Sequence, residues 1–440
     1  MSSRGHVYIA LSTGQNIANL LPILELYTPG DLVLWLESAL ARNLDWTAGP
    51  RQILDERGIP HQTLFCADND PATLHQTVAD YLAREGPARV RLIANGGTKL
   101  QMLAAFRALA GRLDEVLYGQ FQPCVLERYP QDGLAAVGQQ FYVNHQLQLK
   151  ELVACNGMEI LEGKQECIWP GAPLPIPLFG QDAAHTQDCY SRVWEWRKAQ
   201  EPPSAPPVLP YEAAANLAPE QTERFHTTIR NACHLSHTQP IKINEAKAIY
   251  HSAGRLDREA RLAWPASAQG VEARPNIGLE FEQAVAARLV NWLIATPALH
   301  RVVQSVWRNV LIRKQGAKDI RAELDIALLL RSGVLLHLEC KSWDANRKDI
   351  DARFSTLRDI SSQLARLAIC LPSFHGMERT EWHLALLRNL ENIHGWNQHP
   401  IIRFTLPDTP DEEGYQFEDY LARWLRPYLP RAVSGDEVPG

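Results

Sequence analysis

The stretch that decides the fold is AELDIALLLRSGVLLHLECKSW, residues 322–343. Two apolar runs rich in strand-forming residues flank Arg-Ser-Gly at residues 331–333, and this pattern predicts a β-hairpin. A three-residue loop that ends in glycine is a common hairpin connection, because its last residue takes a left-handed backbone conformation. This loop length pairs Leu330 with Val334 and therefore fixes the register of both strands.

The predicted register brings charged side chains to one face of the hairpin. It places Asp325 opposite Glu339 and Glu323 opposite Lys341, and because side chains alternate with a period of two, all four project to the same side. Asp325 and Glu339 can supply the one or two carboxylates by which Mg²⁺ is usually held. Lys341 can orient an attacking water or stabilise charge on a phosphate oxygen.

An alternative interpretation of these charges is an ordinary solvated face of an antiparallel sheet. Against it, the same face continues with residues typical of a half-buried surface: Ala327, Leu329, Leu335 and His337.

A helix is predicted before the hairpin, over GLEFEQAVAARLVNWL at residues 278–293. Its apolar residues recur at helical spacing. Glu282 lies beside this apolar stripe and can face the hairpin, whereas Glu280 is the less favoured choice. The alternative role for Glu282 is that of an acidic residue stabilised by the dipole in the first turn of a helix.

This order of elements resembles the core of the PD-(D/E)xK nucleases, in which an acidic helix precedes a hairpin with Asp on one strand and Glu-x-Lys on the next. The resemblance implies a restriction-endonuclease-like α/β domain that cleaves phosphodiester bonds. It implies catalytic roles for Glu282, Asp325, Glu339 and Lys341. It also implies Glu282, Asp325 and Glu339 as ligands of Mg²⁺ or Mn²⁺.

The first 146 residues alternate predicted strands with predicted helices. HVYIALS, DLVLWLES, HQTLFCA and RVRLIAN are typical of strands, and helices are expected between them, including one over residues 41–58. Strands separated by helices predict a largely parallel sheet, in which ligands bind at the carboxyl ends of the strands.

Two loops at these strand ends stand out. Their glycines let the backbone approach a ligand closely, and helix-start amides point toward phosphate oxygens. The second loop lacks the first glycine of a Walker A motif, so ATP hydrolysis is not expected. The plain alternative is a strand-to-helix turn with an exposed lysine. The loops comprise Ser12, Thr13, Gly14, Gln15 and Asn16, and Asn95, Gly96, Gly97, Thr98 and Lys99.

Together the loops resemble those of CARF domains, the Rossmann-like sensors of cyclic oligoadenylate in type III CRISPR immunity. A CARF domain followed by a PD-(D/E)xK domain resembles the cyclic-oligoadenylate-activated ancillary nucleases. Their G-x-x-[LF]-E, E-L-D and E-C-K patterns correspond here to Gly278 to Glu282, residues 323–325 and residues 339–341.

This resemblance implies a homodimer that binds the ring across its two-fold axis through the ten loop residues. It favours cyclic tetra-adenylate over cyclic hexa-adenylate as the activator, and single-stranded DNA or RNA as the substrate. The implied domains are a CARF sensor over residues 1–146, a bridging region over 147–270 and a nuclease domain over 271–440.

Composition is ordinary for a globular protein, with 45% apolar and 21% charged residues and a net charge of −6. The negative charge gives no global field for nucleic acid, so such binding must use a local basic strip. The eight cysteines form no CxxC pair, so we expect reduced thiols in a cytoplasmic protein. The sequence contains no unbroken run of about 20 apolar residues, so we expect no membrane span.

The segment after the hairpin predicts that local strip, suited to a phosphate backbone without base specificity. It contains Arg347, Lys348, Arg353, Arg358 and Arg366. An amphipathic helix is expected through Leu357, Ile360, Leu364, Leu367 and Ala368. Tryptophans 382, 396 and 424 could stack on bases, with core packing as the favoured role.

Three other functions remain open at this level. The protein could be a ligand-responsive regulator that binds nucleic acid without cutting it, although such a module does not need Asp, Glu and Lys together. It could use Arg388 and His394, which fit the loose spacing of HEPN ribonucleases. Its amino-terminal site could also degrade its own activator.

Overall fold

The computed structural model describes residues 5–66, 70–86, 89–122, 124–130, 139–142, 147–200, 277–343, 347–361, 364–374, 380–394 and 399–429. The chain divides into two units, residues 1–183 with 278–440, and residues 184–277. The described residues of the second unit are helical: residues 184–200 belong to α7 (Ala183–Gln200), and Ile277 is the first residue of α12 (Ile277–Ala295). The larger unit contains two seven-stranded sheets.

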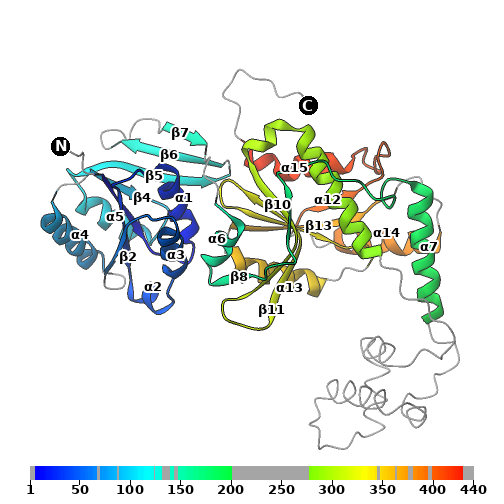
Figure 1. Cartoon of the computed structure of the whole chain (residues 1–440), viewed down its shortest axis with the longest axis horizontal. Helices are drawn as coiled ribbons and strands as arrows, with labels where there is room; N and C mark the ends of the chain where they lie inside the picture. Colours follow the sequence, from blue (N-terminus) through cyan, green and yellow to red (C-terminus); the bar gives the residue numbers. More distant parts are fainter. Residues whose placement is uncertain are drawn as a thin grey trace, which may run out of the picture. The chain divides into compact units, whose positions relative to one another are not determined.

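The first sheet has the strand order β3-β2-β1-β4-β5-β6-β7 (Figure 1). The first five strands in this order are parallel, and β6 and β7 extend them as an antiparallel meander. The strands are β1 (His6–Leu11), β2 (Leu32–Glu37), β3 (His61–Phe65), β4 (Arg89–Ile93), β5 (Leu113–Phe121), β6 (Cys124–Pro130) and β7 (Gln139–Tyr142).

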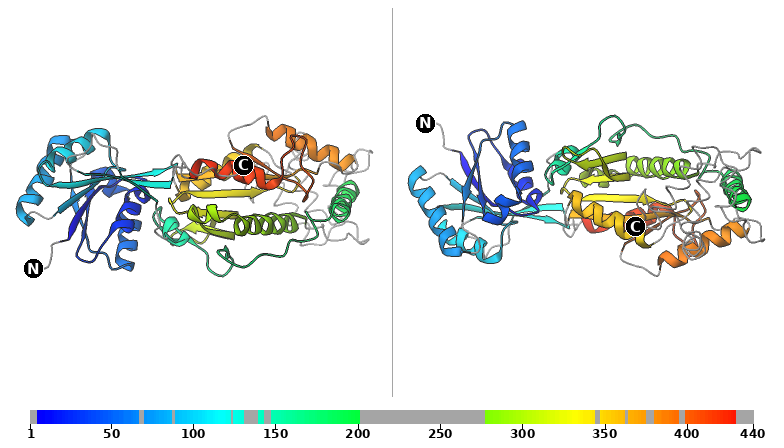
Figure 2. Two further views of the ribbon diagram at one scale, coloured as in Figure 1. Left: turned by 90° about the horizontal axis from the view of Figure 1, so that it is seen from above. Right: turned by 90° about the horizontal axis from the view of Figure 1, so that it is seen from below.

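Helices cover both faces of this sheet, as Figure 2 shows. On one face α4 and α5 share an apolar core with alternate residues of β1, β2 and β4. Local signals fix the helix starts: Asp70 caps α4 ahead of its first-turn proline, and Thr98 forms a capping box with Gln101 at α5. The helices are α1 (Asn16–Leu26), α2 (Ala39–Asn43), α3 (Ala48–Glu56), α4 (Pro71–Glu85) and α5 (Lys99–Ala108).

The single helix expected over residues 41–58 is wrong, because two short helices, α2 and α3, occupy this region. Ser38 caps α2, so the first helix starts earlier than expected. The break contains Asp45, whose φ of +48° is incompatible with a continuous right-handed helix.

The second sheet has the order β14-β13-β12-β11-β10-β8, and β9 also pairs with β10. Its centre is antiparallel, whereas β12, β13 and β14 run parallel. The strands are β8 (Met158–Ile160), β9 (Glu166–Trp169), β10 (Val303–Lys314), β11 (Ile320–Leu330), β12 (Leu335–Cys340), β13 (Ala365–Pro372) and β14 (Ile401–Phe404). The segment predicted to bridge the domains supplies α6 (Leu149–Ala154) and β8, so it completes this sheet.

Helices pack on the second sheet around an aromatic core. Phe281 of α12 meets Phe404 of β14 edge to face, and Arg288 bonds both Glu418 and the carbonyl oxygen of Thr405. These contacts hold α12 against β14 and α15. The elements are α12 (Ile277–Ala295), η3 (Pro297–Arg301), α13 (Arg347–Ser361), α14 (Glu381–His394), α15 (Phe417–Leu425) and η5 (Arg426–Tyr428).

The amphipathic helix expected to run through Ala368 is wrong in its second part. Helix α13 ends at Ser361, and Leu367 and Ala368 lie in β13. This strand pairs with β12 on one side and β14 on the other, and its residues are almost all buried. Backbone pairing on both sides therefore overrides the local helical pattern.

The predicted hairpin register is confirmed. Leu329 pairs with Leu335 and Ile326 with Leu338, and the backbone N–H of Leu330 donates to the carbonyl oxygen of Val334. Gly333 has the expected left-handed conformation, with φ of +77°.

Two further expectations concern the cysteines and the possibility of a membrane span. Within the described part of the chain, cysteines 66, 155, 167, 189, 340 and 370 are all free thiols. No described helix is long and apolar enough to cross a membrane. The domain limits at residues 146 and 270 stay predictions.

Candidate active site

The hairpin strands separate where the charged residues begin. The ladder between β11 and β12 ends at the pair Ile326–Leu338. Beyond it the carboxylate Oδ2 of Asp325 accepts a hydrogen bond of 2.8 Å from the backbone N–H of Cys340. A side chain thus replaces a ladder bond, and this contact fixes the Asp325 carboxylate beside the Glu-Cys-Lys segment.

Glu339 is at the centre of the charged cluster and is only 1% exposed. Its Oε1 lies 2.5 Å from Nζ of Lys341 and 3.3 Å from Nε of Arg353. Its Oε2 lies 3.4 Å from Nε2 of His337. Asp325, His337 and Glu339 each present a ligand atom, and these three atoms lie within 4.8 Å of one another.

Burial and nearby charges shift the pKa values of Asp325 and Glu339 in opposite directions. Burial raises the pKa of Asp325 well above its usual value, and the nearby Glu339 and Glu282 raise it further. Burial also acts to raise the pKa of Glu339, but His337, Lys341 and Arg353 more than offset this, so its pKa is lowered. Glu339 is therefore the more acidic of the two carboxyl groups.

The pKa values of Lys341 and His337 are shifted in opposite directions by their surroundings. Burial acts to lower the pKa of Lys341, but its contact with Glu339 dominates and the pKa is raised, so the side chain is an ammonium. Burial lowers the pKa of His337 to about 4 despite the nearby Glu339, so its imidazole is neutral.

Glu282 lies half-buried on α12. Its pKa is raised by burial first and then by the charges of Glu323 and Glu339. The charges that act on Glu282 thus belong to residues of the hairpin, and its role in the site stays a prediction. Glu323 itself is exposed.

His337 is the member of the cluster to which the sequence analysis gave no chemical role. It is 1% exposed and lies on the strand face that carries Glu339, two residues further on. That spacing was a usable signal, but the flanking leucines favoured a core position.

The predicted basic strip is present only in part. Arg353 contacts Glu339 and donates to the carbonyl oxygen of Glu323, whereas Arg358 packs over Phe354. The side chains of residues 347 and 348 lie outside the described set. Among the aromatic and HEPN-like candidates, Trp382 and Trp424 are buried and Arg388 is exposed on α14, whereas Trp396 and the side chain of His394 lie outside the description.

The two predicted ligand loops lie next to each other, at the carboxyl ends of the adjacent strands β1 and β4. A Cβ added to Gly96 would lie 2.2 Å from the carbonyl oxygen of Leu11 and 2.8 Å from Cγ2 of Thr13. Only glycine permits this approach.

Hydrogen bonds hold both loops in place. Asn16 accepts from the backbone N–H of Thr13 and donates to the carbonyl oxygen of Trp46. Asn95 exchanges two bonds with the backbone of Gly119. The side chains of both asparagines are thus committed to the fold, while Gly97, Thr98 and Lys99 are exposed.

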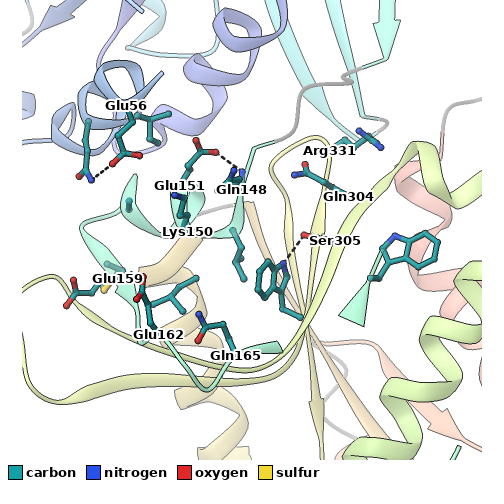
Figure 3. A pocket seen from close by; sticks show the side chains of 18 of the residues that line it. Glu56, Gln148, Lys150, Glu151, Glu159, Glu162, Gln165, Gln304, Ser305 and Arg331 are labelled. Atoms are coloured by element: carbon teal, nitrogen blue, oxygen red, sulfur yellow. Dashed lines mark hydrogen bonds between the residues drawn. The ribbon is translucent and has the colours of Figure 1, made fainter. Parts of the chain in front are cut away.

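Two cavities border these regions. One of about 650 Å³ is lined by Thr13, Gly14 and Asn16 together with Lys314 and Arg358. The other, of about 890 Å³, contains none of the predicted site residues (Figure 3). Its carboxylates include Glu151, paired with Arg57, and Glu159, paired with Arg313. Its acidic lining does not suit a phosphate backbone.

Comparison with known proteins gave matches in structure alone. No family model and no curated protein matches the sequence. The protein VC1899 from Vibrio cholerae superposes with a TM-score of 0.54 at 13% identity, covering 96% of this chain and 98% of that one. Can2 from Sulfobacillus thermosulfidooxidans, in complex with cyclic tetra-adenylate, superposes with a TM-score of 0.54 at 16% identity, covering 96% and 99%. The chain has the fold of these proteins.

This likeness confirms the predicted fold class. The chain combines a largely parallel, Rossmann-like sheet with a second, mixed α/β domain. At these identities the likeness concerns the fold, so the roles of Glu282, Asp325, Glu339, Lys341 and the loop residues stay predictions.

Proposed function

We propose that this protein is a metal-dependent nuclease of type III CRISPR defence, activated by a cyclic oligoadenylate. The observation that carries the proposal is the convergence of Asp325, Glu339 and Lys341 at the open end of one hairpin. Two further observations support it: the adjacent glycine-containing loops of the first sheet, and a shared fold with Can2, which binds cyclic tetra-adenylate.

The donor atoms of the cluster fit a divalent cation. Asp325 and Glu339 offer oxygen ligands, and Glu282 lies near enough to contribute further negative charge to the site. A bound Mg²⁺ or Mn²⁺ would polarise a phosphodiester and make water more acidic. Without a cation, burial of several carboxyl groups in one place is unfavourable.

The protein's own residues divide the remaining work. Arg353, which is partly exposed, is placed to attract the phosphate backbone. Lys341 holds its ammonium at Glu339 and stabilises negative charge that develops on a phosphate oxygen.

The same hairpin links this site to the candidate sensor. A Cβ added to Gly333, in the turn, would lie 2.8 Å from Cγ2 of Ile17 and 2.9 Å from Cδ1 of Leu21. Both residues belong to α1, which starts at the end of the first ligand loop. A shift of α1 on ligand binding would therefore act on the turn of the hairpin whose other end carries Asp325 and Glu339. We expect the activator to bind across a homodimer.

The decisive experiment measures cleavage of labelled single-stranded and double-stranded DNA and of RNA by the full chain. Cyclic tetra-adenylate or cyclic hexa-adenylate is added or left out, with Mn²⁺, with Mg²⁺ or with chelator. We expect cutting only when ring and metal are both present. Lys341→Ala should abolish cutting while the ring still binds.

Each contrary outcome has a distinct meaning. If the chain binds the cyclic oligoadenylate and nucleic acid but cuts under no condition, the alternative function is supported, namely a ligand-responsive regulator that binds nucleic acid without cutting it. Cutting that persists in chelator would exclude the metal-dependent mechanism. A Lys341→Ala protein that cuts at the normal rate would contradict the role given to Lys341.

A further inference from the structure

His337 is an unusual residue for the interior of a strand pair. It pairs with Ala327 across the hairpin and is surrounded by leucines on β12, yet it is 1% exposed and carries two ring nitrogens that need partners. Its Nδ1 is enclosed and has no hydrogen-bond partner among the described residues. An aliphatic side chain would pack here without that cost.

The other ring nitrogen faces the carboxylates. The backbone N–H of Asp325 donates to Nε2 over 3.3 Å, so Nε2 is an acceptor and the ring proton is on Nδ1. This contact is long for a hydrogen bond, and Oε2 of Glu339 lies 3.4 Å from the same nitrogen, so a cation bound between them would replace the Asp325 N–H as the partner of the single Nε2 lone pair. Two acceptors at this distance without a proton between them repel each other, and a cation between them removes the repulsion.

The geometry fits a common ion. Ligand atoms about 2.1 Å from an octahedral cation are about 3.0 Å apart when adjacent and about 4.2 Å apart when opposite. The ligand atoms of Asp325, His337 and Glu339 lie within 4.8 Å of one another, close to this range. The remaining groups do not compete for this position, since Lys341 and Arg353 both contact Oε1 of Glu339.

We propose that Nε2 of His337 is a third ligand of the cation held by Asp325 and Glu339, and that it makes the site select Mn²⁺ over Mg²⁺. Imidazole nitrogen binds transition-metal ions, whereas Mg²⁺ prefers oxygen. This inference rests on the metal site in the proposed function and adds the identity of one ligand and the preference that follows from it.

The test uses direct metal binding to the full-length chain in the absence of nucleic acid. Manganese electron paramagnetic resonance measures how much Mn²⁺ is bound, and electron-spin-echo modulation detects a nitrogen coordinated to the bound ion. Protein labelled with ¹⁵N-histidine changes the modulation from ¹⁴N to ¹⁵N frequencies if the nitrogen belongs to histidine.

Three variants locate that nitrogen. His337→Gln and His337→Asn should remove the nitrogen coupling and weaken Mn²⁺ binding by about tenfold or more, with Mg²⁺ affinity, measured by competition, changed much less. His300→Gln is the matched control, because His300 is half-buried in the same unit and its Nε2 contacts the carbonyl oxygen of Leu293 instead of the cluster. It should retain both the coupling and the affinity. Two substitutions at His337 are used so that, if one variant misfolds, the other can still be measured.

The outcomes separate this inference from the proposed function. Bound Mn²⁺ without nitrogen coupling in the wild-type protein overturns the role of His337 and leaves the metal site intact. Equal loss of Mn²⁺ and Mg²⁺ affinity in both variants overturns the selectivity. Absence of any Mn²⁺ binding, even with activator present, contradicts both the inference and the metal-dependent nuclease.

Discussion

The edge of the first sheet and the open end of the β11–β12 hairpin are both candidate sites, but they are built in opposite ways. At the sheet edge the polar side chains of Asn16 and Asn95 are already satisfied by backbone groups. What remains exposed is the glycine backbone, with Thr98 and Lys99.

At the hairpin end the polar groups are buried and their charges are not balanced. Glu339 has three charged or polar neighbours, and the pKa of Asp325 is raised by burial and by other carboxyl groups. From this difference we infer that the first region is ordered in advance for its proposed ligand, whereas the second needs a cation to balance its carboxylates. The predictions below test this contrast.

The largest effect is expected at the hairpin. Glu339→Gln should lower activated cleavage by at least about a hundredfold, because it removes a charged ligand from the centre of the cluster. Single-turnover kinetics measures this loss. Glu323→Gln, an exposed carboxylate on the same strand face, is the control and should stay within a few-fold of wild type. Equal losses would show that the cluster acts only through its net charge.

The next effect tests the rigidity of the loops. Gly96→Ala should destabilise the protein by about 2–3 kcal/mol, because its Cβ would overlap the backbone oxygen of Leu11. Urea unfolding measures the change, and binding of the ring should be lost as well. The comparison is Gly111→Ala, with φ of +80° and no atom within 4 Å of the added Cβ, which carries only the left-handed strain of about 1 kcal/mol.

A smaller effect tests the link between the regions. Gly333→Ala should cost about 1–2 kcal/mol through its left-handed φ and should reduce activation because the added methyl group meets Ile17 and Leu21. Gly316→Ala has the same strain, with φ of +76°, but an open environment. If both variants are activated normally, the turn does not transmit the signal.

The smallest effect concerns an exposed cation. Lys99→Ala should weaken binding of cyclic tetra-adenylate by about fivefold, since one solvent-exposed charge contributes about 1 kcal/mol to a phosphate contact. Isothermal titration calorimetry measures it, with Lys150→Ala, exposed on α6, as the control. An unchanged affinity would remove Lys99 from the binding site while leaving the hairpin chemistry untouched.

The sequence by itself determined the local features of this protein. The turn length and the period of two fixed the register that pairs Ile326 with Leu338, next to Asp325 and Glu339, because both depend on neighbours along the chain. Asp70 and its following proline marked the start of α4 for the same reason. The alternation of strands and helices was enough to predict a largely parallel first sheet.

Only the tertiary structure decided the features that depend on distant partners. Residues 365–372 became a strand because β12 and β14 pair with them from both sides, although their own pattern continued that of a helix. Arg353 joined the hairpin carboxylates because α13 brings Nε of its side chain within 3.3 Å of Oε1 of Glu339. Such contacts join segments far apart in the chain, and local periodicity contains no information about which segments will meet.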